Sequence, residues 1–501
     1  MNSRMRRITL FFRIHAYTAM ILIFVVITIG VGIVTVRNSQ DNVVINEVCT
    51  SNVRCCEDEN GKYPDWIEIY NPTSRDIDLS GYIINDSADL KKEKYIVPQG
   101  TVLAAGSYYL FDPLFSLSSE GCTVNILDDR ERYVDRVKIP RLKYDTTYGR
   151  LKDGSGEWGV KMPTPGYSNT DGEDIIPTIS GSVNASYDSG FYSDEIELAL
   201  YSSDYGRDIY YTTDGSDPVH NGTLYEDPIR IYDRSEEKNV YSAIPEVSLG
   251  YIENNDPLPS FPVDKCTVVR AVAKDHLGRY TDVSTHTYFI GFDEKKAYDN
   301  MAVVSIVSDP EDLFSDGNGI MVLGDKYALY IEEGKPEEYE AAKANFASKG
   351  RQSERETYVQ IFDEKHVPVL ASSAGIRIKG KTSRWDVQKS FSVIFRRAYS
   401  GYSKNHFTLD GLDFDIHSFN LEKCGQDAKT KMKDAIMETC MRDTECVTMK
   451  MVPCCIFLDG EYFGFYWLTE RLDNSFIASE YGVGKDNVII TSVFDIENGV
   501  E

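Results

Sequence analysis

Residues 375–391 read GIRIKGKTSRWDVQKSF, and they indicate how the last part of the chain folds. Apolar and polar residues alternate on both sides of the centre, which predicts two β-strands joined by a turn. The turn holds Gly380, Ser383 and Arg384, and Lys389 begins the second strand. Glycine lets the backbone approach a ligand closely, and neighbouring cations and hydroxyls are groups that bind a nucleotide phosphate. The segment is therefore a candidate phosphate-binding turn.

A mixed pattern of helix and strand surrounds this turn over residues 301–501. Residues 427–440 predict a helix with Asp427 as its N-cap, because apolar residues recur there at helical spacing. Residues 454–468 predict a hairpin, since Asp459-Gly460 is a dipeptide typical of type I′ turns. This module is expected to be an α+β domain.

Several ordered motifs in this module resemble the CotH family, spore-coat protein H and its relatives, which are atypical protein kinases. The motifs are VSI at 304–306, GKTS at 380–383, KSF at 389–391, MKDA at 432–435, and DGEYFGFY at 459–466 followed by Glu470. The resemblance implies a kinase amino-terminal lobe with ATP and Mg²⁺ as cofactors. It implies that Lys389 pairs with the α and β phosphates, and that Gly380, Ser383 and Arg384 shape the turn around them. Either Glu470 or Glu438 would orient Lys389, and residues 467–471 would form the hinge beside adenine.

The resemblance also implies that the catalytic base and the magnesium ligands lie beyond the hinge. The chain ends at Glu501, so we expect a CotH kinase domain truncated at its carboxy end. No catalytic residue is assigned for this reason. No metal site is assigned either, because the histidines are scattered and the cysteines lack the spacing of a zinc knuckle.

The first module, residues 42–169, shows short alternating strands at the spacing of a β-sandwich. Its segments DWIEIYN at 65–71, LSGY at 79–82 and TPGYSN at 164–169 resemble the lamin-tail domain. This resemblance implies an immunoglobulin-like scaffold used for attachment or interaction. We interpret Asp65 and Glu68 as exposed carboxylates at a strand edge rather than as an acid/base pair.

A second β module covers residues 177–291. The segments YYTTDGSDP at 210–218 and RAVA at 270–273 resemble the C-terminal domain of chitobiase and β-hexosaminidase, which implies a non-catalytic sandwich. We interpret Asp214 and Asp217 as turn residues, with a calcium site as the alternative. The charged, proline-bearing insertion 233–259 predicts a surface loop.

The N-terminus and the composition indicate the location. Four arginines in the first 13 residues precede an uncharged run at 16–36, which has the ~20 residues needed to span a bilayer. We therefore expect a cytoplasmic tail at 1–15, an uncleaved signal anchor at 16–36, and a single-pass cell-membrane protein whose bulk faces outward. The formal net charge of −26 excludes nucleic acid as a partner. The ten cysteines predict buried thiols with one or two disulfides, Cys49, Cys55, Cys56 and Cys122 being the candidates.

The expected fold class is a multi-domain chain: a transmembrane helix, two all-β sandwiches of which the first is immunoglobulin-like, and an α+β kinase-like amino-terminal lobe. The expected function is that of a bacterial, membrane-anchored, extracytoplasmic CotH-like protein, a fragment of a kinase that phosphorylates surface or spore-coat proteins. The alternative is a non-catalytic surface adhesion protein with a degenerate kinase-like segment. Expected partners are protein substrates, surface or coat proteins, cell-wall glycans and the membrane.

Overall fold

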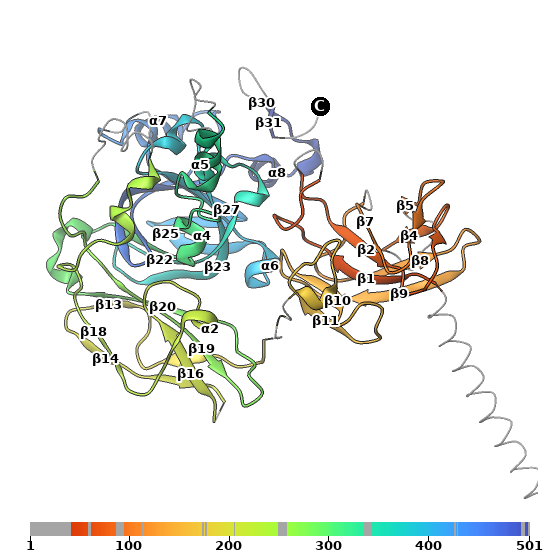
Figure 1. Cartoon of the computed structure of the whole chain (residues 1–501). Helices are drawn as coiled ribbons and strands as arrows, with labels where there is room; N and C mark the ends of the chain where they lie inside the picture. The colour runs from red at the N-terminus through yellow and green to blue at the C-terminus, as the bar shows by residue number, and fades with distance from the viewer. Residues whose placement is uncertain are drawn as a thin grey trace, which may run out of the picture. The chain divides into compact units, whose positions relative to one another are not determined.

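A computed structural model describes most of the chain (Figure 1). The described residues are 42–58, 62–86, 95–112, 115–172, 175, 178–204, 206–248, 258–334, 343–424, 427, 429–491 and 496–498. The chain divides into two compact units, Met1–Ile176 and Pro177–Glu501. Each unit is described by itself.

The first unit is an immunoglobulin-like sandwich of two antiparallel sheets. One sheet has the order β11-β10-β1-β2-β7 and the other the order β5-β4-β8-β9, with β3 and β6 paired beside them. The strands are β1 (Val44–Cys49), β2 (Trp66–Tyr70), β3 (Ile77–Asp78), β4 (Ile83–Asn85), β5 (Tyr95–Ile96), β6 (Val102–Leu103), β7 (Tyr108–Phe111), β8 (Cys122–Leu127), β9 (Tyr133–Ile139), β10 (Thr147–Arg150) and β11 (Trp158–Lys161). Ile67 and Ile69 of β2 enter the core between the sheets, as the period-two pattern requires.

The second unit begins with a smaller β module. Its main sheet has the order β13-β20-β19-β16-β17, and two pairs, β14-β18 and β12-β15, accompany it. The elements are β12 (Val183–Ala185), β13 (Gly190–Tyr192), β14 (Ile196–Leu198), β15 (Leu200–Ser202), β16 (Asp208–Thr212), α2 (Pro218–Asn221), β17 (Thr223–Leu224), β18 (Ile229–Ile231), η2 (Tyr241–Ala243), η3 (Pro245–Val247), β19 (Thr267–Lys274), β20 (Ser284–Ile290), η4 (Phe292–Glu294) and η5 (Lys296–Tyr298).

A closed seven-stranded barrel completes the second unit, in the order β21-β22-β23-β24-β27-β29-β28. Its strands are β21 (Ala302–Val307), β22 (Arg355–Phe362), β23 (Pro368–Lys379), β24 (Ser390–Ile394), β27 (Ser418–Glu422), β28 (Met451–Leu458) and β29 (Glu461–Glu470). The barrel closes because β21 pairs in parallel with β28.

Short elements decorate the barrel. They are α4 (Pro310–Phe314), α5 (Gly324–Glu332), η7 (Asn345–Ala347), η8 (Arg351–Ser353), η9 (Thr382–Trp385), α6 (Arg397–Ser400), β25 (Asn405–Leu409), β26 (Leu412–Ile416), α7 (Lys433–Met441), α8 (Asn474–Tyr481), η11 (Lys485–Asn487), β30 (Ile490–Thr491) and β31 (Ile496–Asn498). The predicted hairpin turn is confirmed, since Asp459 and Gly460 have φ angles of 45° and 90°.

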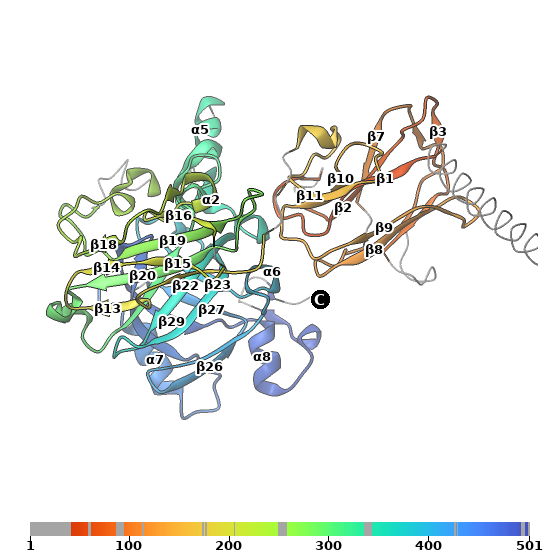
Figure 2. The ribbon, with the colours of Figure 1, turned by 90° about the horizontal axis from the view of Figure 1, so that it is seen from below.

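The barrel and the preceding β module share one aromatic cluster, so they pack as one body. Phe289, at the end of β20, stacks on Phe191 of β13 with ring centroids 4.3 Å apart, and it meets Phe457 of β28 edge-on at 5.0 Å. Phe289 also contacts Phe362 of β22 edge-on at 5.6 Å, and Figure 2 shows β20 next to this barrel strand.

The structure corrects the predicted fold class. The expected α+β lobe is instead a mostly β closed barrel, and the longest α-helices among its described residues, α5 and α7, have only nine residues each. The strands form a closed ring because β21 and β28, which are far apart in sequence, pair with each other in parallel. The transmembrane helix is not supported either. Within the described residues no helix is long and apolar enough to cross a membrane, and the segment 16–36 lies outside them.

The insertion 233–259 was also predicted incorrectly in its described part. It forms η2 and η3, and Val247 of η3 is buried in the barrel core with 3% of its surface exposed. The segment is charged overall, but Val247 lies in the barrel core and Ile244 and Leu258 pack against it, whereas Val240 stays exposed.

Candidate functional site

The turn between β23 and β24 is tightly folded on itself. Gly380 has a φ of +119°, and a Cβ at this position would lie 2.2 Å from the Oγ atom of Ser383, so only glycine fits. The Arg384 side chain is 8% exposed and donates from Nε to the Gly380 carbonyl at 2.6 Å. Its Nη1 atom donates to the carbonyls of Phe346 and Ser348 at 3.1 and 2.9 Å. The guanidinium therefore holds the turn against the barrel.

Lys389 lies under this turn with no exposed surface. Its Nζ atom donates to the carbonyls of Val247, Arg384 and Asp386 at 2.7, 2.5 and 3.0 Å. It also lies 4.1 Å from the centre of the Phe346 ring, an attractive cation–π contact. Burial, with the nearby Lys423 charge, lowers the pKa of Lys389 well below its usual value. The three carbonyls oppose that shift, because they accept from all three N–H groups of the ammonium form.

Other cations at this end of the barrel are also engaged. Lys423 pairs with the Asp386 carboxylate, and Lys379 pairs with Glu422. Lys431 donates to the Gln388 side chain at 2.7 Å and to the Phe465 carbonyl at 3.1 Å. The predicted turn is therefore positively charged, but its charges are used within the protein.

The structure does not bring Glu470 to Lys389. Strands β24, β27 and β29 are neighbours, and their register places Glu470 level with Val393. That is four residues along from Lys389, about 13 Å at the usual rise of a strand. The Glu470 carboxylate instead accepts from the Lys450 side chain and backbone at 2.8 and 2.9 Å. The alternative, Glu438, accepts from the Met449 backbone at 2.8 Å.

The described conformation does not fit a phosphate group at Lys389. A lysine has three N–H donors, and here all three are directed at backbone carbonyls. The described residues contain no group of three or more acidic, histidine or cysteine side chains placed to hold a metal ion. Among the described residues, this conformation therefore presents no free donor at Lys389 for the phosphates of ATP and no cluster that could hold Mg²⁺.

The aspartates of the second module take turn roles. The Asp214 carboxylate accepts from the Ser216 backbone at 3.0 Å and from its hydroxyl at 2.6 Å. Asp217 caps α2 by accepting from the Val219 backbone at 3.0 Å.

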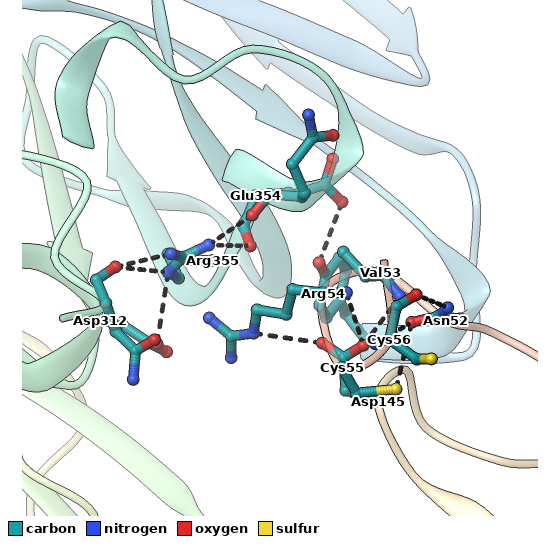
Figure 3. A network of polar contacts seen from close by, with 12 residues as sticks. Asn52, Val53, Arg54, Cys55, Cys56, Asp145, Asp312, Glu354 and Arg355 are labelled. Carbon is teal, nitrogen blue, oxygen red and sulfur yellow. Dashed lines mark hydrogen bonds and ion pairs between the residues drawn. The ribbon is translucent and has the colours of Figure 1, made fainter. Parts of the chain in front are cut away.

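All ten cysteines are described, and all are free thiols. The expected one or two disulfides are therefore absent from the structure. In the Cys55-Cys56 loop, the Asn52 side chain donates to the Cys56 carbonyl at 2.6 Å and accepts from the Cys55 thiol at 3.1 Å (Figure 3). In the second unit the same figure shows Arg355, which contacts Asp312 at 3.5 Å. Hydrogen bonds thus hold the Cys55-Cys56 loop, for which a covalent link was expected.

Sequence reasoning missed a buried carboxylate network in the first unit. Glu68 is fully buried rather than exposed, and it accepts from Asn46 at 3.0 Å and from the Gly166 backbone at 2.7 Å. Glu47 beside it accepts from Thr147 and Thr164 hydroxyls at 2.5 and 2.9 Å. Burial raises the pKa of Glu68 to about 7 and raises that of Glu47 as well. The sequence signal for this network was the presence of both DWIEIYN and TPGYSN. The hydrogen bond from the Gly166 amide to the Glu68 carboxylate joins these two segments.

Asp65, the other carboxylate of the DWIEIYN segment, also has backbone partners. It accepts from the Asn52 and Leu117 amides at 3.4 and 3.0 Å. These contacts hold two loops of the sandwich together.

Three family models match parts of the chain. The Lamin Tail Domain model matches residues 37–141, the Fn3 associated model matches residues 196–288, and the CotH kinase protein model matches residues 376–498. The lamin-tail and CotH resemblances are thereby confirmed. The chitobiase resemblance is not shown, since the match over that module is to Fn3 associated. The CotH match, together with the immunoglobulin-like and fibronectin-associated β domains, indicates a CotH-like extracellular protein.

Comparisons with individual proteins add little. No curated protein matches the chain. Among solved structures, the fibronectin(III)-like modules of Clostridium thermocellum CbhA are 8% identical, cover 45% of this chain and 85% of their own, and give a TM-score of 0.12. The sialic acid binding region of a Streptococcus sanguinis SK1 adhesin is 10% identical, covers 67% of this chain and 90% of its own, and gives a TM-score of 0.11. These TM-scores support no conclusion about this chain.

Proposed function

We propose that this chain is the nucleotide-binding part of an extracytoplasmic CotH-type protein kinase, which phosphorylates surface or coat proteins. The observation that carries the proposal is the CotH kinase match over residues 376–498, the region that contains Gly380, Ser383, Arg384 and Lys389. The two β modules would bind the protein substrate, other surface proteins or cell-wall glycans. The strongly acidic composition suits an exposed surface of this kind.

Nucleotide binding at this turn requires a change in the partners of Lys389. Its ammonium would have to exchange at least one carbonyl for a phosphate oxygen, since no N–H donor is left over. Gly380 and Ser383 would supply the backbone and the hydroxyl beside it.

Calorimetric titration of the chain with Mg-ATP tests the proposal. We expect measurable binding by the unmutated protein and its loss in Lys389→Ala. Lys404→Ala is the matched control, because Lys404 is an exposed lysine paired with Asp415 in the β25–β26 hairpin. Circular dichroism of each variant separates lost binding from lost folding. If all three proteins bound Mg-ATP equally well, Lys389 would not be part of the nucleotide site.

The alternative is a non-catalytic surface protein in which the barrel is a rigid scaffold. The saturation of Lys389 favours it, and Lys265 of the preceding module shows the same arrangement. The Lys265 ammonium donates to the Glu237 and Val263 carbonyls at 2.8 and 2.9 Å and to Asn239 at 3.1 Å. On this alternative Mg-ATP does not bind, and Lys389→Ala only lowers stability.

A further inference from the structure

A segment of the preceding β module covers the candidate nucleotide site. Residues 240–248, here called the strap, lie between β18 and β19 and include η2 and η3. Ser242, Val247 and Ser248 are buried, with 8%, 3% and 0% of their surface exposed. Val247 packs into the core of the barrel, which is formed by residues more than 50 positions further along the chain. The strap therefore belongs to one module by sequence and to the barrel by packing.

One end of the strap contacts the candidate site itself. The Val247 carbonyl accepts from the Lys389 Nζ atom at 2.7 Å, and the Ser248 hydroxyl donates to the Trp385 carbonyl at 2.7 Å. The Glu246 carbonyl accepts from the Leu323 amide at 2.9 Å and fixes the same end to the barrel. Of the three acceptors around Lys389, Val247 is the only one outside the turn.

The other end of the strap is held by a carboxylate and by the Tyr241 ring, which stacks on Phe314 of α4 with the ring centroids 5.1 Å apart. Glu461, the first residue of β29, accepts from the Val240 and Ser242 amides at 2.6 and 2.8 Å, and from the Ser242 hydroxyl at 2.7 Å. Hydrogen bonds to a carboxylate are stronger than those between neutral groups. Glu461 thus acts as a latch that joins the strap to the barrel hairpin.

We infer that the strap is a built-in inhibitor of the candidate nucleotide site, held closed by Glu461, and that nucleotide binding requires its withdrawal. The inference rests on the proposed function. Withdrawal of Val247 frees one N–H of Lys389 and uncovers it, whereas the two acceptors in the turn stay in place. A ligand that binds only the open state has its apparent affinity reduced by the fraction of molecules that are open. Weakening the latch should therefore strengthen binding.

The test uses the full chain, Mg-ATP as the probe, and two variants that loosen the latch. Glu461→Gln removes the carboxylate charge, and Ser242→Ala removes one of its three hydrogen bonds, which is a milder change. Glu226→Gln removes one exposed charge from the same module and is the control. We expect about tenfold tighter Mg-ATP binding by Glu461→Gln, a smaller gain in Ser242→Ala and no change in Glu226→Gln.

Hydrogen–deuterium exchange of residues 240–248 gives a second readout. In the unmutated protein, Mg-ATP should speed exchange in the strap, and Glu461→Gln should speed it without nucleotide. If Mg-ATP binds equally to all variants and leaves exchange in the strap unchanged, the strap is no inhibitor, although the proposed function stands. If Glu461→Gln and Ser242→Ala speed exchange but no variant binds Mg-ATP, the proposed function fails and the inhibitory role fails with it.

Discussion

The first unit and the barrel each bury an ionisable side chain, but they satisfy it in different ways. In the sandwich, Glu68 finds its partners, Asn46 and Gly166, inside the same domain. In the barrel, Lys389 draws one of its three carbonyl partners from Val247, in a segment of the preceding module. A buried group whose partners all lie in its own domain stabilises that domain. A buried group with one partner in a neighbouring module couples the stability of the two modules. The two regions should therefore respond differently when each group is changed.

The largest effect is expected from Lys389→Ala. The change leaves the carbonyls of Val247, Arg384 and Asp386 without this donor and opens a cavity below the Phe346 ring, which should cost about 4 kcal/mol of unfolding free energy. Denaturant unfolding followed by tryptophan fluorescence measures it. The exposed Lys404→Ala should change the same quantity by less than about 1 kcal/mol. If Lys389→Ala lowered the unfolding free energy no more than Lys404→Ala does, the three carbonyls would have found other donors in the variant.

The next effect is a pH dependence that belongs to the sandwich. Burial raises the pKa of Glu68 from 4.5 to about 7, so the folded state binds this proton more tightly than the unfolded state. The stabilisation is complete below pH 4.5 and is lost as the pH rises toward 7, by at most about 3 kcal/mol.

Hydrogen exchange of the β2 amides at pH 5 and pH 7.5, corrected for intrinsic rates, measures this dependence. Glu68→Gln should remove most of it, leaving the part due to Glu47, whose pKa is also raised. Unchanged protection between the two pH values in the unmutated protein would contradict the raised pKa of Glu68.

A smaller effect is expected from Glu461→Ala. It removes three hydrogen bonds to the strap and should cost about 2 kcal/mol of local opening free energy there. Hydrogen exchange should rise in residues 240–248 and stay constant in β1 and β2. A rise spread over the whole second unit would mean that the latch supports the fold rather than the strap alone.

The smallest effect is expected from Ser248→Ala, which removes the hydrogen bond to the Trp385 carbonyl. We expect a loss of about 1 kcal/mol, seen as a small shift in the denaturant midpoint. An unchanged midpoint would assign the contact between the strap and the turn to Val247 alone.

The sequence predicted the local features of the fold well. The strand at 65–71 follows from its alternation, and the Asp459-Gly460 turn follows from its dipeptide. The tight turn at Gly380 follows from the glycine, because its φ of +119° is unfavourable for other residues. Each of these features depends on a few neighbouring residues.

Features that depend on distant partners were not predictable. The parallel pairing that closes the barrel joins strands far apart in sequence, so nothing in either strand marks it. Glu470 occurs in the expected motif, but the register of three strands places it about 13 Å along from Lys389. The insertion 233–259 was interpreted as a surface loop because it is charged and contains prolines, whereas Val247 within it is buried in the barrel core and Ile244 packs against that core.

The parallel contact between β21 and β28 also determines when the barrel can form. Val304 lies opposite Ile456, and all the other strands of the ring except β29 lie between these two residues in the sequence. A chain synthesised from its N-terminus cannot close this ring until β28 and then β29, which joins β28 to β27, have left the ribosome, and contacts of such long sequence separation form slowly. Until then β21 has one unpaired edge, which is open to pairing with other chains. A molecule exported across a membrane would therefore need protection from aggregation until its last strands arrive.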